Sequence, residues 1–307
     1  MKSLTNRINL FFKPWDDFWF GNKDFYCLSL FRVVFGLILL VMYSFRHIDV
    51  SFYFLDSGFL PRDLIHFVLP EFYRPPIMWF PKSDIGIVIL HSCYLAGLVV
   101  MILGVFGRWF QVLLLAIHLM FIFRNPTVIY GADIVSSFWL FYLCLVDARQ
   151  NWSILNFFKN KGDTGKLEKA RPISDLLNSA AIRLFQIQLC IIYGYTGMEK
   201  LKGAPWWEGT ALWNVVANSQ LALMDFSFVL RWPLVIIIGT YFTLIFEIYF
   251  PALVWPKKIR MWVLLAGVLL HIGIAITMGL VFFSAVMVAS YILFLESNAV
   301  RFRFLKS

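Results

Sequence analysis

The segment YTGMEKLKGAPWWEG, residues 195–209, places Lys200 and Lys202 between a long apolar stretch and the pair Trp206–Trp207. A lysine shielded from water loses part of the stabilisation of its ammonium form, so it can act as a base near neutral pH. The two tryptophan rings are suited to provide that shielding. A lysine at the end of a membrane helix can also extend to the interface without any chemical role. Both interpretations stay open at this point.

The helical period distinguishes the two lysines. Counting back along a helix from Lys200, the residues on its face are Tyr193, Thr196 and Gly197. The glycine leaves room beside the amine, and the tyrosine hydroxyl lies within reach. Lys202 would point roughly the opposite way. We therefore predict that Lys200 is a base, with Tyr193, Trp206 and Trp207 forming part of a cofactor-binding site.

The elements that position these residues are membrane spans. Hydrophobic residues make up 60% of the 307-residue chain and charged residues only 15%, whereas soluble domains carry about 25% charged residues. We predict an all-α, polytopic helix bundle in the membrane, with a turn near residues 277–279. Eight spans are predicted at about 28–44, 85–106, 109–123, 133–146, 177–198, 233–254, 261–277 and 279–295.

Lysine and arginine residues are distributed unevenly between the two sides of these spans. The side that carries both termini receives more than twice as many as the other, so both termini are predicted to be cytoplasmic. Residues 1–27 form a cytoplasmic or interfacial segment, 28–295 the transmembrane domain and 296–307 a cytoplasmic tail. The basic loop 147–176 then faces anionic membrane lipids.

The net charge of +9 does not indicate nucleic-acid binding, because the basic residues lie in short loops and form no continuous patch. The four cysteines fall in or beside apolar segments without metal-ligand spacing. We predict neither a metal site nor a disulfide framework.

All five histidines fall on the predicted outer side. His91, His118 and His271 lie in the outer parts of their spans, and His47 and His66 lie in the first outer loop. A single membrane histidine is commonly a packing residue. Several on the side of Lys200 favour a shared cavity, since ionisable groups in a membrane usually face one another or water. We predict that His91, His118 and His271 line one cavity with Lys200, and that His91 and His118 belong to the cofactor-binding site.

Four other charged residues lie within or at the ends of spans. For Arg32 and Arg183, the simplest interpretation is that the side chain extends to the interface. Glu247, placed in the inner half of its span, is either a hydrogen-bonding anchor between helices or part of a proton path. Asp133, beside Arg124, begins the fourth predicted helix, where a carboxylate suits the helix dipole.

Four segments in collinear order resemble one known family. They are LFRVVFGLILLV, VDARQNWSIL, YTGMEKLKGAPWWEG and LHIGIAITMGLVFFSAVMVASYILF. They are similar to the first span, the D-A-x-x-x-W-S stretch, the K-L segment and the late F-H segment of proteins with the horizontally transferred transmembrane (HTTM) domain. That domain also forms the membrane part of the vitamin K-dependent gamma-carboxylases. The resemblance runs from about residue 25 to 297.

The resemblance implies a site open to the outer face. The lysine of the K-L pair is the family's base toward vitamin K hydroquinone, and the late-span histidine lies in the same site; these correspond to Lys200 and His271. The implied cofactor is a reduced, vitamin K-like quinone. Where the carboxylases carry N-N-H-S-Y, this chain has RNPTVIYG, and it lacks their large lumenal region. The resemblance therefore implies either a carboxylase-like lyase or another quinol-dependent enzyme that modifies peptides, and strict glutamate carboxylation is the less expected of the two.

Three functions follow as alternatives. The first is a multi-pass membrane enzyme, in the cytoplasmic membrane if the source is a bacterium, that uses a quinol-like molecule and modifies a secreted peptide. The second is a maturation or export factor for a secreted, toxin-like peptide precursor, working with a helper protein. The third is a non-enzymatic binding or transport protein.

Overall fold

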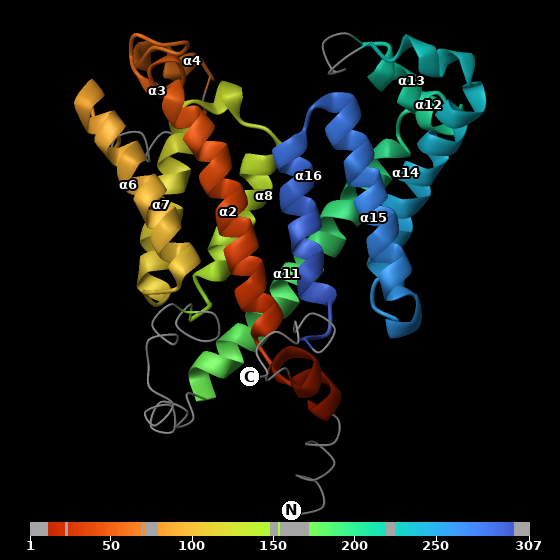
Figure 1. The fold of residues 1–307 in the computed structure, drawn as a ribbon, viewed down its shortest axis with the longest axis horizontal. Coiled ribbons are helices and arrows are strands. Elements are labelled where there is room, and N and C mark those ends of the chain that lie inside the picture. Colours follow the sequence, from red (N-terminus) through yellow and green to blue (C-terminus); the bar gives the residue numbers. More distant parts are fainter. Residues whose placement is uncertain are drawn as a thin grey trace, which may run out of the picture. The chain divides into compact units, whose positions relative to one another are not determined.

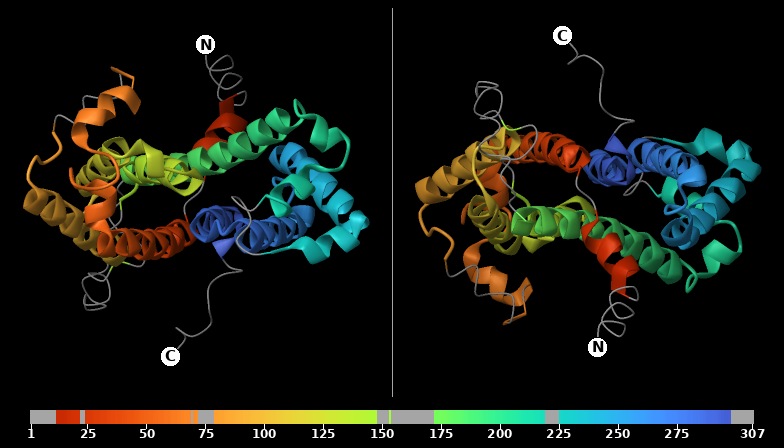
Figure 2. Two further views of the ribbon diagram at one scale, coloured as in Figure 1. Left: turned by 90° about the horizontal axis from the view of Figure 1, so that it is seen from above. Right: turned by 90° about the horizontal axis from the view of Figure 1, so that it is seen from below.

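The computed structural model describes residues 12–21, 24–68, 70–71, 79–147, 153, 172–218 and 225–297. Every regular element in these ranges is helical, as the all-α prediction requires (Figures 1 and 2). The chain forms two compact units. Unit 1 is residues 1–184 with 295–307, and unit 2 is residues 185–294. The boundary between the units falls within one long helix, α11 (Pro172–Lys200). Most of the basic loop 147–176 lies outside the described residues.

Within the described residues, five helices are long and apolar enough to cross a membrane. They are α2 (Tyr26–Ile48), α6 (Asp84–Leu103), α11, α14 (Pro233–Leu253) and α15 (Lys257–Met278). Two shorter apolar helical segments correspond to the predicted fourth and eighth spans. They are α8 (Gly131–Leu143) and residues 281–294. The predicted third span corresponds to α7 (Arg108–Arg124). The protein is thus a multi-pass helical membrane protein, and the count of eight crossings remains a prediction.

In unit 1, α2 packs against α6, α6 against α7, and α7 against α8. The face of α2 that enters this core repeats at intervals of four residues, with Phe31, Phe35 and Leu39 fully buried. Trp139 of α8 is also fully buried, and its ring meets the Phe31 ring edge-on. Short helices lie before α6 and α8, namely α3 (Val50–Phe54), η1 (Arg62–Leu64), α4 (Ile65–Val68) and η3 (Pro126–Val128).

In unit 2, α14 packs against α15, and α15 folds back onto α16 (Val281–Ser290), which continues as η5 (Tyr291–Phe294). The turn between α15 and α16 is made by Gly279, whose φ of 67° lies in the left-handed region that favours glycine. The predicted turn near 277–279 is confirmed. Figure 2 shows this hairpin as the blue segments. Three short helices connect α11 to α14: α12 (Ala204–Trp207), α13 (Ala211–Val216) and η4 (Ser227–Arg231).

The expectation that Arg32 reaches the membrane interface is wrong. Its side chain is fully buried, and its Nη1 donates a hydrogen bond of 2.6 Å to the carbonyl oxygen of Met101. Met101 lies in the last turn of α6, where carbonyl groups lack partners within the helix. Arg183 is half-buried, and its Nε donates to the carbonyl oxygen of Phe18 at 2.7 Å. Both arginines therefore join helices within unit 1.

Candidate functional site

A pocket of about 610 Å³ lies within unit 2. Its walls come from the end of α11, from α12 and α13, and from the helices α14, α15 and α16. Most of the lining side chains are apolar. The ionisable and aromatic polar side chains among them are Tyr193, Lys200, Trp206, Glu247 and His271. Such a pocket suits a molecule with a large apolar body and a few polar groups.

Lys200 and Glu247 form an ion pair in this pocket. The Nζ atom of Lys200 lies 2.7 Å from Oε2 of Glu247, and the exposed fractions of the two side chains are 23% and 9%. Lys200 is the last residue of α11, whereas Glu247 lies well inside α14. The end of α11 therefore meets α14 partway along its length. A lysine assigned to a helix end from sequence is in fact paired with a carboxylate in the interior of a neighbouring helix.

Glycine in α11 permits this approach. A Cβ atom built on Gly197 would lie 2.9 Å from the backbone nitrogen of Ile248 and 3.1 Å from the carbonyl carbon of Glu247. The two helix backbones are thus in direct contact at Glu247 and at the next residue, Ile248. The small residue that the sequence placed on the face of Lys200 is the one at which α14 crosses.

A hydrogen-bonded chain of three side chains begins at His271. The hydroxyl oxygen of Tyr193 lies 2.7 Å from Nε2 of His271 and 2.5 Å from the hydroxyl oxygen of Tyr291. All three side chains are buried. The other ring nitrogen of His271, Nδ1, is buried and has no hydrogen-bond partner in the described part of the chain. Lys200 and His271, the two residues implied by the family resemblance, thus line one pocket.

The two tryptophans have different surroundings. Trp206 lines the pocket, and its ring centroid lies 5.3 Å from Nζ of Lys200, a distance typical of a cation–π contact. The side chain of Trp207 is exposed, and its Nε1 donates to the carbonyl oxygen of Leu201 at 2.7 Å. Trp206 is the tryptophan that covers the amine. Lys202 lies outside the pocket, where its Nζ contacts Oε1 of Glu199 at 2.6 Å.

His91 and His118 belong to unit 1 and have partners there. Nδ1 of His91 lies 3.0 Å from Nδ1 of His47, and Nδ1 of His118 lies 2.8 Å from the hydroxyl of Tyr94. Neither histidine is among the residues that line the pocket of unit 2. Their assignment to cofactor binding stays a prediction. The side chain of His66 lies outside the described residues.

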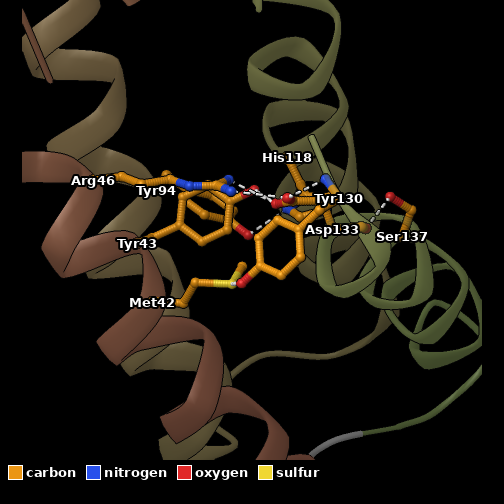
Figure 3. Close-up of polar contacts among 8 residues, drawn as sticks. All are labelled: Met42, Tyr43, Arg46, Tyr94, His118, Tyr130, Asp133 and Ser137. Atoms are coloured by element: carbon orange, nitrogen blue, oxygen red, sulfur yellow. Dashed lines mark hydrogen bonds and ion pairs between the residues drawn. The ribbon is translucent and has the colours of Figure 1, made fainter. Parts of the chain in front are cut away.

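The polar centre of unit 1 is a buried ion pair between Arg46 and Asp133, shown with its surroundings in Figure 3. The guanidinium donates two hydrogen bonds, of 2.6 and 2.8 Å, to the two carboxylate oxygens. Tyr43 donates a third bond to Asp133 at 3.2 Å. Arg124, which the sequence places near Asp133, forms its ion pair with Asp56 instead, at 2.9 Å. Asp133 does lie in the first turn of α8, as predicted.

Sequence reasoning missed two contacts of the unit 2 pocket. It treated Glu247 as an anchor or a proton-path residue without naming Lys200 as its partner. The contact could have been predicted, because charged groups within spans usually pair with one another. It was missed because the two residues were assigned to opposite halves of the membrane. Tyr291 gave no signal, since it stands in an apolar run and only the hairpin fold brings it to Tyr193.

Comparison with known protein families shows to which family the chain belongs. The sequence model of the HTTM domain family matches residues 20–298, which is most of the chain. The chain belongs to the HTTM domain family. No solved structure matches it.

Two relatives of this HTTM protein come from Bacillus subtilis strain 168. Sporulation-delaying protein SdpB is 25% identical over 305 residues, which are 96% of this chain and 86% of SdpB. Uncharacterized protein YitO is 27% identical over 183 residues, 57% of this chain and 56% of YitO. The chain thus spans just over half the length of YitO and most of the length of SdpB.

Proposed function

We propose that this HTTM protein binds a lipid-soluble, quinol-like molecule in the pocket of unit 2 and removes a proton from it, with Lys200 essential to that step. The observation that carries the proposal is the Lys200–Glu247 pair, which places an ammonium and a carboxylate in a pocket with mainly apolar walls. A group in this position can exchange a proton with a bound hydroxyl while the apolar body of the same molecule occupies the rest of the pocket.

The pocket fits a reduced quinone in size and in chemistry. Its volume of about 610 Å³ lies within the range of small-molecule sites. Lys200 and Glu247 would hold one hydroxyl of the ring, and His271 lies on the same pocket to meet a second polar group. When bound, a quinol supplies an aryl hydroxyl that becomes a reactive anion after loss of its proton. Modification of a secreted peptide would use that anion. Glutamate carboxylation is not part of the proposal.

Filling the pocket tests whether a lipid-soluble molecule binds there. A Cβ atom at Gly273, which lines the pocket, would meet no atom within 4 Å. Gly273→Phe should therefore fold and occupy the space. We expect organic extracts of the purified wild-type protein to contain a quinone by mass spectrometry, and extracts of Gly273→Phe to have lost it. Leu265→Phe, at an exposed site on α15, is the matched control and should retain it. Equal quinone content in both variants would contradict the proposal.

A second candidate is a role in maturing or exporting a secreted peptide with a helper protein, without peptide modification. The observation that favours it is the similarity over nearly the whole chain to SdpB, a protein named for delaying sporulation. The two candidates differ in what happens to the peptide. Mass spectrometry of a secreted peptide encoded beside this protein would show a change of mass beyond proteolysis under the first proposal. Under the second, the peptide would be cleaved or exported without an added group.

A further inference from the structure

We infer that Glu247 is a carboxylic acid once a proton has left the bound molecule, while Lys200 stabilises the resulting anion as an ammonium ion. This inference rests on the proposed function and assigns the two partners of the pair different roles in it. It makes Glu247 a catalytic residue and Lys200 the electrostatic partner of the anion.

The hydrogen bonds of the Glu247 carboxylate support this assignment. Oε2 of Glu247 accepts from Lys200, and Oε1 accepts no hydrogen bond within the described part of the chain. Two threonine hydroxyls on the same helix have other partners: the hydroxyl of Thr243 donates to the carbonyl oxygen of Gly239, and that of Thr240 accepts from the backbone nitrogen of Leu212. Oε1 is therefore an available acceptor on a pocket-lining side chain.

Proton counting leads to the same result from either resting state. A neutral pair holds one mobile proton, either as ammonium with carboxylate or as amine with carboxylic acid. When a hydroxyl O–H bond breaks and its proton enters the pair, both members are protonated. The site then contains an oxyanion, the ammonium of Lys200 and the carboxylic acid of Glu247. No electron is transferred, and the site's net charge does not change.

The alternative has Lys200 as the sole base. It starts from a free amine beside an ionised Glu247, a pair with one proton fewer, and gives an unfavourable final state. Glu247 would remain ionised, and two anions would flank one ammonium in a pocket with largely apolar walls. Like charges close together in such surroundings repel strongly. Protonation of Glu247 removes that repulsion and leaves one anion beside one cation. The Trp206 ring, 5.3 Å from Nζ of Lys200, adds stabilisation to the cation.

The test uses 2-naphthol, an aryl alcohol whose neutral and anionic forms absorb at different wavelengths. It is added to the detergent-purified protein, and its ionisation is measured by absorbance. The carboxyl groups are followed by infrared difference spectroscopy. In the wild-type protein we expect bound naphtholate together with the carbonyl band of a protonated carboxylic acid. That band should disappear in Glu247→Gln and shift in Glu247→Asp, which assigns it to this residue.

Lys200→Ala should lower the naphtholate fraction by about tenfold or more, because the neighbouring positive charge is lost. Lys202→Ala, at an exposed site outside the pocket, should match the wild type. Bound naphtholate in the wild-type protein without the carboxylic-acid band would overturn the inference and leave Lys200 as the base. If the naphthol stays neutral when bound to the wild-type protein, the proposed proton removal itself fails.

Discussion

Lys200 and Lys202 stand two residues apart and have different surroundings. Lys200 contacts Glu247 and the ring of Trp206 inside the pocket. Lys202 contacts Glu199 with 70% of its side chain exposed. Exposed ion pairs contribute little free energy, whereas a partly buried pair shields both charges from water and makes each depend on the other. The chemistry proposed for this segment therefore involves Lys200 and not Lys202.

Replacing the two lysines separately tests this assignment. If a secreted precursor is encoded beside the protein, we expect Lys200→Ala to abolish its maturation, because the pocket loses its only lysine among the described lining residues. Lys202→Ala should have little effect, as most exposed substitutions do. Detergent-extracted yield serves as the folding control. Full maturation with Lys200→Ala would rule out the proton-removal mechanism, and equal losses in both variants would indicate surface electrostatics instead.

The Lys200–Glu247 pair should also show energetic coupling. Removal of either partner leaves the other charge unpaired in a mainly apolar pocket, so each single variant should be destabilised. In the double variant Lys200→Ala/Glu247→Gln no charge remains to be paired. We expect it to be more stable than the sum of the single losses predicts, with a coupling free energy of about 0.5–3 kcal/mol. Denaturation in mixed detergent micelles measures all four proteins. Additive losses would show that the contact contributes nothing.

In unit 1, the buried pair Arg46–Asp133 should matter more for stability than the partly exposed contact of Asp56. Asp133→Asn leaves the Arg46 guanidinium buried without a charged partner, at a cost of about 3–5 kcal/mol in the free energy of unfolding. Asp56 is 42% exposed, and the buried guanidinium of Arg124 keeps its bonds to the carbonyl oxygens of Leu60 and Leu55. Asp56→Asn should therefore cost less, about 1 kcal/mol. Similar losses in the two variants would contradict a structural role specific to Asp133.

At the scale of the elements, the crossing of α11 and α14 positions the pair. Gly197 brings the two backbones together, so the last turn of α11 places Lys200 against the interior of α14. The α15–α16 hairpin then brings His271 and Tyr291 to Tyr193, two helical turns before Lys200. One helix, α11, thus carries contacts to both polar parts of the pocket.

Glycine-to-alanine changes test the crossing. Alanine favours a helix over glycine by about 1 kcal/mol. At Gly273, where a Cβ meets open space, Gly273→Ala should be neutral or stabilising. At Gly197 the added carbon would overlap the backbone of α14, so Gly197→Ala should lower the free energy of unfolding by about 1–3 kcal/mol. Gly197→Ala should also reduce maturation of the secreted peptide, because Lys200 and Glu247 move apart. Thermal melting in detergent compares the two, and a stabilised Gly197→Ala would argue against close packing.

At the scale of the whole molecule, the charge distribution predicts that both termini and the loop 147–176 are cytoplasmic. All four cysteines of the described residues are free, so a cysteine-free variant breaks no disulfide. A single cysteine introduced at Gly162, outside the described residues, should not react with an impermeant thiol reagent added to intact cells. It should react once the cells are lysed. Labelling from outside intact cells would show that the loop faces the outer side, opposite to the prediction.

The sequence by itself determined the class of protein, the position of each apolar helix, the turn at Gly279 and the face that Lys200 shares with Tyr193 and Gly197. These depend on local composition and on the helical period, which a single segment contains. The tertiary structure decided the partners: Glu247 for Lys200, Tyr291 for Tyr193, and Arg46 rather than Arg124 for Asp133. Each of these contacts joins residues 47 or more positions apart. Depth estimated from helix ends cannot supply them, because a helix can end against the middle of its neighbour, as α11 does against α14.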